Sequence, residues 1–177
     1  MSESIVDRMR GAALLDVNTY EAVEADRNAT GQAFVVVVIV AICQGIGAYE
    51  GGAVGIIAGV MGAILGWLLW SGVTMLVGTK LFGGTADWGE LLRTLGFAQA
   101  PGVLAVMGVV ALLRLPLGLL IPLWQLVTGI VAIRQALDFG TGKAVLTAIA
   151  SFVVVLVVMT MMAGLFGATA ALGAGMF

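Results

Sequence analysis

The chain has 177 residues, of which 61% are hydrophobic and only 10% are charged, and its formal net charge is −2. A soluble domain carries roughly 25% charged residues, so this chain has too little polar surface for a soluble globule and is typical of a membrane protein. A net negative charge provides no basic surface for nucleic acid, and a chain without histidine lacks the commonest metal ligand and general base.

Residues 1–29 precede the first apolar segment, and we predict that they form a cytoplasmic, amphipathic N-terminal segment. Apolar side chains at helical spacing lie at Ile5, Met9, Ala12 and Ala13. Asn18 followed by Glu21 matches the capping-box pattern, and it predicts a second helix that runs towards Gln32.

Five apolar segments are long enough to cross a bilayer, which takes about 20 mostly apolar residues. We place these spans at residues 30–48, 53–82, 97–113, 117–137 and 143–166. The third span is the weakest, because Pro101 lacks an amide donor and tends to end or kink a helix. The sequence leaves two alternatives open for it: a full crossing or a re-entrant segment.

The distribution of basic residues favours five crossings, since Lys and Arg collect in cytoplasmic loops. With a cytoplasmic N-terminus, seven of the eight basic residues lie inside: Arg8, Arg10, Arg27, Lys80, Arg93, Arg134 and Lys143. Only Arg114 lies outside, whereas a re-entrant third segment would give six inside and two outside. The predicted fold is therefore an all-α integral membrane bundle of five transmembrane helices with amphipathic interfacial helices, and residues 30–177 form its membrane domain.

The second span carries a face of small residues at Gly55, Gly59, Gly62 and Gly66. Small residues let helix backbones approach closely in lipid. We expect this face to pack against another helix of the same chain. A seam between two copies in a homodimer is the alternative, because the same spacing serves either use.

The charged segment between the second and third spans predicts an interfacial helix at residues 87–96, lying along the inner leaflet. Asp87 can cap this helix, and Glu90 three residues later completes a capping box. Trp88 suits an anchor at headgroup level. The helix is either a connector with a polar face or a docking surface. The candidate surface for a partner or for lipid comprises Asp87, Trp88, Glu90, Leu92, Arg93 and Lys143.

The fourth span contains a candidate intramembrane polar site formed by Gln125, Thr128, Arg134 and Asp138. Polar residues within spans are either helix–helix hydrogen-bonding groups or functional groups. Arg134 lies near the inner end, where it can snorkel to the headgroups or pair with Asp138 one turn later. In the functional alternative, Gln125 and Thr128 line a polar path together with Gln44.

Motifs of known chemistry are incomplete in this chain. The segment Gly140–Lys143 reads GTGK, but a phosphate-binding loop would need glycine at position 137 and Ser or Thr at 144, where Leu137 and Ala144 stand. No span contains paired carboxylates. We therefore expect no enzymatic activity, with no catalytic, cofactor-binding or metal-binding residues.

Three stretches resemble the Yip domain family of membrane proteins, first known as Ypt/Rab-interacting proteins, and in particular its prokaryotic branch. They are VNTYEAVEADRNATGQA (residues 17–33), LFGGTADWGELLRTLGFAQAP (81–101) and LWQLVTGIVAIRQALDFGTGKAV (123–145). The resemblance implies five spans and a cytoplasmic N-terminus. The chain lacks the long polar N-terminal region and the DLYGP-type motif of the eukaryotic branch, so the resemblance does not extend to Rab binding.

The function that these features favour is that of a non-enzymatic membrane protein that organises protein partners or lipids at the bacterial inner membrane. The alternative is a small-solute or lipid transporter or channel with a polar path near Gln125. The expected partners are membrane lipids, an unidentified membrane or cytosolic protein and a second copy of the chain. We expect no nucleic acid and no cofactor.

Overall fold

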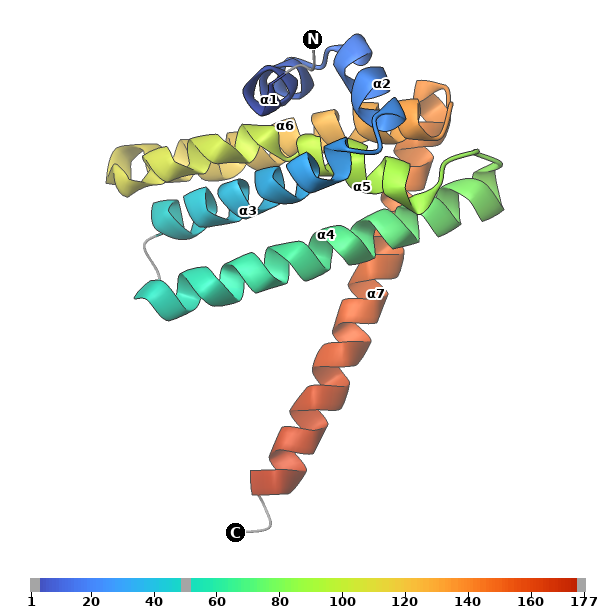
Figure 1. The fold of residues 1–177 in the computed structure, drawn as a ribbon. Coiled ribbons are helices and arrows are strands. Elements are labelled where there is room, and N and C mark those ends of the chain that lie inside the picture. The colour runs from blue at the N-terminus through green and yellow to red at the C-terminus, as the bar shows by residue number, and fades with distance from the viewer. Residues whose placement is uncertain (1–3, 49–51, 175–177) are drawn as a thin grey trace.

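A computed structural model describes the backbone of residues 4–48 and 52–174, and the side chains of these residues up to Met161. The described residues form helices and no strands (Figure 1). The helices are α1 (Ile5–Ala13), α2 (Val17–Ala25), α3 (Ala29–Ala48), α4 (Gly52–Phe82), α5 (Trp88–Phe97), the 3₁₀ helix η1 (Ala100–Val109), α6 (Ala111–Ala136) and α7 (Thr141–Ala174).

Within the described part of the chain, five helical segments are long and apolar enough to cross a membrane, which confirms the predicted all-α, five-span class. They are Ala29–Ala48, Gly52–Phe82, Trp88–Val109, Ala111–Ala136 and Thr141–Met161. The third differs most from expectation, since it begins at Trp88 rather than near residue 97 and combines α5 with η1. The turns after α4 and α6 lie at the same end of the spans as the start of α3 (Figure 1).

The third span changes from α-helix to 3₁₀ helix at Pro101. Proline has no N–H group, so the α-helical hydrogen-bond pattern cannot continue through it. Instead Gly102 N donates to Gln99 O at 2.8 Å. A 3₁₀ run of ten residues is unusual, since runs longer than 3–4 residues are uncommon. Helix α3 packs closely against this 3₁₀ helix at Gly47. A Cβ atom on Gly47 would lie only 1.8 Å from Ala105 O, so only glycine allows this approach.

Helix α5 is surrounded by other helices. Residues 91–97 are all buried, and α5 contacts α2, α3, α4 and α6. This differs from the expectation of an interfacial helix at 87–96, which would bury only its apolar face. Trp67 of α4 reinforces the packing, because its indole Nε1 donates to Leu92 O at 3.0 Å.

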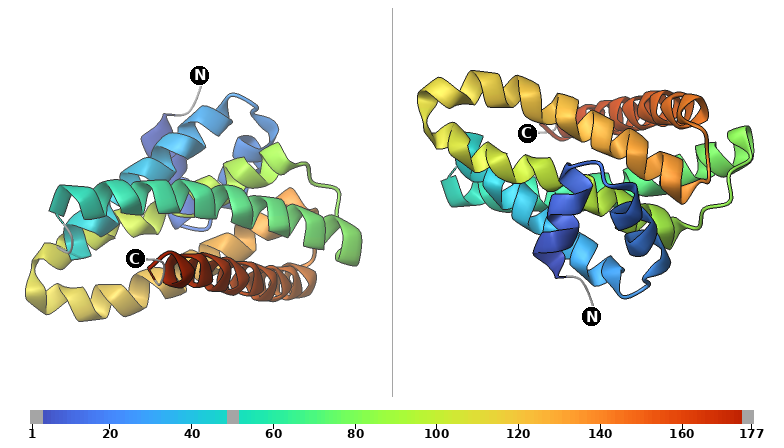
Figure 2. Two further views of the ribbon diagram at one scale, coloured as in Figure 1. Left: turned by 90° about the horizontal axis from the view of Figure 1, so that it is seen from below. Right: turned by 90° about the horizontal axis from the view of Figure 1, so that it is seen from above.

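Helices α1 and α2 lie across one side of the bundle, over α5 and α6 (Figures 1 and 2). We call this pair the N-terminal cap. The predicted start of the second helix is wrong by two residues, since Asp16 rather than Asn18 is its N-cap and accepts from Asn18 N at 3.1 Å. The helix ends at Ala25 and does not continue towards Gln32, because a turn at residues 26–28 separates it from α3.

The glycine face of α4 is open. No atom lies within 4 Å of a Cβ built on Gly59, Gly62 or Gly66, so these three residues do not pack against any described helix as expected. Helix α7 packs its first part against α4 and α6 and then diverges from the other helices (Figure 1). The second half of α4 and the start of α7 therefore make the contact between these two helices, away from the open glycines.

Candidate functional site

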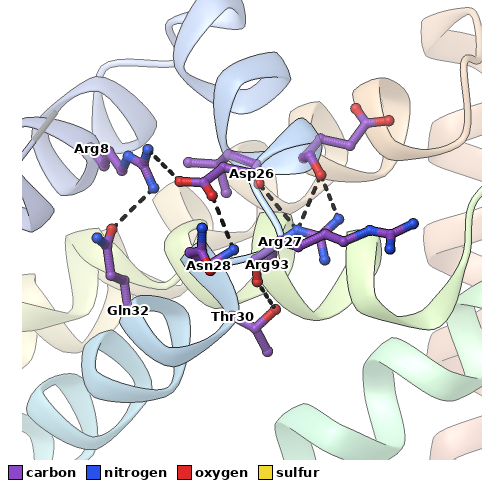
Figure 3. Close-up of polar contacts among 9 residues, drawn as sticks. Arg8, Asp26, Arg27, Asn28, Thr30, Gln32 and Arg93 are labelled. Carbon is purple, nitrogen blue, oxygen red and sulfur yellow. Dashed lines mark hydrogen bonds and ion pairs between the residues drawn. The ribbon is translucent and has the colours of Figure 1, made fainter. Parts of the chain in front are cut away.

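The N-terminal cap is tied to the bundle by a buried arginine of α1. Arg8, only 6% exposed, forms an ion pair with Asp26 at 2.8 Å and donates from Nη1 to Gln32 Oε1 at 3.1 Å. The hydrogen bond from Arg8, together with that from the Asn28 amide, lowers the pKa of Asp26. Figure 3 shows Arg8 reaching both the α2–α3 turn and the first part of α3.

A second buried arginine joins the cap to the third span. Arg93 of α5 is 5% exposed, and its Nε donates to Val23 O at 3.2 Å and to Glu24 O at 3.1 Å (Figure 3). Its Nη2 also donates to Glu24 O. The last carbonyl groups of a helix have no partner within it and carry partial negative charge. Arg93 therefore caps the C-terminus of α2.

Two side chains complete the attachment at α6. The hydroxyl group of Tyr20 lies 3.1 Å from Ala12 O and 3.3 Å from Thr128 O, and Trp124 Nε1 donates to Ala13 O at 2.8 Å. Burial raises the pKa of Tyr20 above its ordinary value, so the phenol remains a hydrogen-bond donor. The cap is thus fixed to α3, α5 and α6 by specific polar contacts.

Carboxylates from α2, α5 and the end of α6 gather beside the cap. Burial, followed by the negative charges of Glu90 and Asp138, raises the pKa of Glu24 to about 7. Glu21 adds a further negative charge and accepts from Gln135 Nε2 at 3.1 Å. We call Glu21, Glu24, Glu90 and Asp138 the acidic edge.

The candidate partner surface is only partly accessible. Asp87 and Glu90 form the predicted capping box, with both hydrogen bonds at 2.8 Å, and Trp88 is 46% exposed. Leu92 and Arg93 are buried and present no outer surface. Lys143 donates to Phe82 O at 3.2 Å and lies 5.4 Å from the centre of the Phe139 ring.

The four polar residues of the fourth span do not share one site. Gln125 Nε2 donates to Gln99 O at 3.1 Å, and Thr128 Oγ1 donates to Ala98 O at 2.6 Å. These two residues satisfy carbonyl groups next to the break in the third span. Further along α6, Arg134 Nε donates to the neighbouring Gln135 at 2.9 Å. Asp138 accepts from Thr85 at 3.1 Å, and no ion pair with Arg134 forms.

A cavity of about 260 Å³ lies between α3, η1 and α6. Its polar lining residues are Gln44, Arg114 and Gln125. The sequence analysis predicts a path shared by the two glutamines, but it does not predict that Arg114 joins them. Thr128, the third residue expected on that path, does not line the cavity, since its hydroxyl group is bound to Ala98 O.

The described residues hold no group of three or more His, Cys, Asp or Glu side chains that could bind a metal ion. Five described helical segments long and apolar enough to cross a membrane define an integral, multi-pass membrane protein. The chain belongs to the Yip1 domain family, whose model matches residues 17–162. No curated protein and no solved structure matches the chain.

Proposed function

We propose that this Yip1-domain protein organises protein partners at the cytoplasmic face of a membrane and catalyses no reaction. The observation that supports this proposal is the attachment of the N-terminal cap. Arg8, Tyr20 and Arg93 are buried and bonded, so α1 and α2 form a fixed surface and not a loose tail. A preorganised surface binds a partner without a large loss of conformational entropy.

The chemistry of the acidic edge favours a basic protein segment as the partner. Its four carboxylates come from α2, from α5 and from the turn after α6, and their mutual repulsion contributes to the raised pKa of Glu24. A positively charged partner would relieve this repulsion. Anionic headgroups of the inner leaflet attract basic segments and repel carboxylates, so a lipid surface is a poorer match.

The proposed location is the bacterial cytoplasmic membrane, with the cap inside the cell. The orientation rests on seven of the eight basic residues lying on the side of the cap. The bacterial assignment rests on the resemblance to the prokaryotic branch and on an Ala-, Gly- and Val-rich, Lys-poor composition.

Cross-linking in native membranes tests the proposal through a charge reversal in the acidic edge. Glu21→Lys changes an exposed side chain, and Glu50→Lys makes the same change on the side that the charge pattern places outside. We expect a defined set of proteins to be captured by the wild type and by Glu50→Lys and to be lost from Glu21→Lys. Identical captured proteins for all three chains would contradict the proposed surface.

A further inference from the structure

The cavity between α3, η1 and α6 exists because glycines bring three helices together. A Cβ on Gly102 of η1 would lie 2.6 Å from Gln125 Nε2 and 3.3 Å from Gln44 Nε2. The two carboxamides therefore converge above the bare backbone of η1, one from α6 and one from α3. Gln125 uses one amide hydrogen for Gln99 O, and no described residue accepts from or donates to the Gln44 carboxamide.

Arg114 supplies a positive charge at the same cavity. Its Nε donates to Gly108 O at 3.4 Å, and Gly108 also lines the cavity. Its two terminal nitrogens have no partner among the described residues, and no described Asp or Glu lines the cavity. A guanidinium group with both terminal nitrogens available is suited to bidentate binding of a phosphate or carboxylate.

An apolar hollow adjoins the polar cavity. It is lined by Leu104, Leu117, Leu120, Ile121, Leu123, Trp124 and Val127, and it shares Leu117 and Ile121 with the cavity. Several of these side chains are exposed on the surface that would face hydrocarbon, including Leu120 at 59% and Leu123 at 60%. A charged and amide-lined cavity next to an apolar hollow is complementary to an amphiphile.

We propose that this cavity binds the headgroup of an anionic glycerophospholipid. The phosphate contacts the guanidinium group of Arg114, the headgroup hydroxyls contact Gln44 and Gln125, and an acyl chain follows the adjoining hollow. At about 30 Å³ per water-sized group, 260 Å³ holds roughly eight to nine such groups, which is sufficient for a phosphoglycerol headgroup. A free anion would leave the hollow unused, so the hollow favours a lipid. The polar cavity contains no residue of the N-terminal cap, and the proposed lipid site goes beyond the proposed function.

Native mass spectrometry of the full chain in detergent tests this site with three added probes: phosphatidylglycerol, phosphatidylcholine and inorganic phosphate. We expect tighter binding of phosphatidylglycerol than of phosphatidylcholine, and no displacement of lipid by phosphate. Arg114→Gln removes the charge and should weaken phosphatidylglycerol binding about tenfold or more, since charge-assisted hydrogen bonds contribute about 1.5–3 kcal/mol. Arg27→Gln makes the same change at an exposed position just before the N-terminus of α3, whereas Gln44 lies near the C-terminus of that helix. This control should leave phosphatidylglycerol binding unchanged.

Gln44→Leu provides a second variant that does not depend on Arg114. Because no described residue bonds the Gln44 carboxamide, this variant should keep its thermal midpoint and still bind phosphatidylglycerol several-fold more weakly. Equal phosphatidylglycerol binding by wild type, Arg114→Gln and Gln44→Leu would overturn the proposal. Displacement of the lipid by inorganic phosphate would overturn the lipid assignment in favour of a free anion.

Discussion

Arg93 Nε lies 3.1 Å from the carbonyl oxygen of Glu24, so a side chain of the third span caps the C-terminus of a helix that precedes the first span. This contact makes the N-terminal cap part of the folded bundle. Arg93→Gln removes the guanidinium donors that cap the buried carbonyl of Val23 and the partly buried carbonyl of Glu24.

We expect Arg93→Gln to lower the free energy of unfolding by about 2–3 kcal/mol, because hydrogen bonds from a charged group contribute about 1.5–3 kcal/mol. Denaturant titration in detergent micelles measures this change. Arg27→Gln, at an exposed arginine, is the matched control and should change the value by less than about 0.5 kcal/mol. Equal losses for the two variants would show that Arg93 does not hold the cap.

The raised pKa of Glu24 predicts a pH dependence of stability. The folded protein binds the Glu24 proton more tightly than the unfolded chain, because the pKa rises from 4.5 to about 7 on folding. Stability should therefore fall as the pH rises from about 4.5 to 7 and should be independent of this group above that range. The thermal midpoint of wild type minus that of Glu24→Gln should decrease between pH 5 and 7. A difference that stays flat over this interval would contradict the assignment.

Substitution by alanine should affect stability differently at two glycines that lie in different surroundings. Gly47→Ala would place its Cβ 1.8 Å from Ala105 O, whereas Gly59→Ala meets no atom within 4 Å. We expect Gly47→Ala to destabilise the protein by about 1–3 kcal/mol, since α3 and η1 must separate. Gly59→Ala should be neutral or slightly stabilising because alanine has the higher helix propensity. Thermal unfolding in detergent compares the two, and a larger loss at Gly59 would contradict the observed packing.

Thr128 supports the break in the third span. Thr128→Val removes the hydroxyl that donates to Ala98 O at 2.6 Å and should cost about 1–3 kcal/mol, the penalty for an unsatisfied buried carbonyl. Thr160→Val is the control, because Thr160 is exposed and its hydroxyl, among the described residues, bonds only the carbonyl of Leu156 in its own helix. Similar stabilities for the two variants would exclude a supporting role for Thr128.

The class of the fold could be predicted from the sequence because each span is a long apolar segment, and this property is local. The capping box at Asp87 and Glu90 is also local, since it depends on two residues three positions apart. Pro101 correctly predicts an interruption of the third span, whereas the amphipathic pattern before it wrongly places the helix at residues 87–96 on the membrane surface. Its burial depends on α2 folding over Arg93, which no local pattern encodes.

The candidate site was less predictable for the same reason. The sequence identifies Gln44 and Gln125 as polar residues within spans, and the structure brings their carboxamides together beside Gly102. The charge pattern identifies Arg114 only as the one basic residue on the outer side, because its approach to the cavity depends on the hydrogen bond to Gly108 O. The glycine face of α4 matched a known packing pattern, but spacing alone does not specify a partner helix.

The orientation of the N-terminal cap is the most direct test of the account, because a partner surface in the cytoplasm requires the cap to lie there. Cys43, the only cysteine, is replaced by alanine, and single cysteines are introduced at Glu21 in the cap and at Ala111 at the opposite end of α6. Intact cells are then treated with a membrane-impermeant thiol reagent. We expect labelling at position 111 and none at position 21 until the cells are opened. Labelling at position 21 in intact cells, with none at 111, would contradict the account.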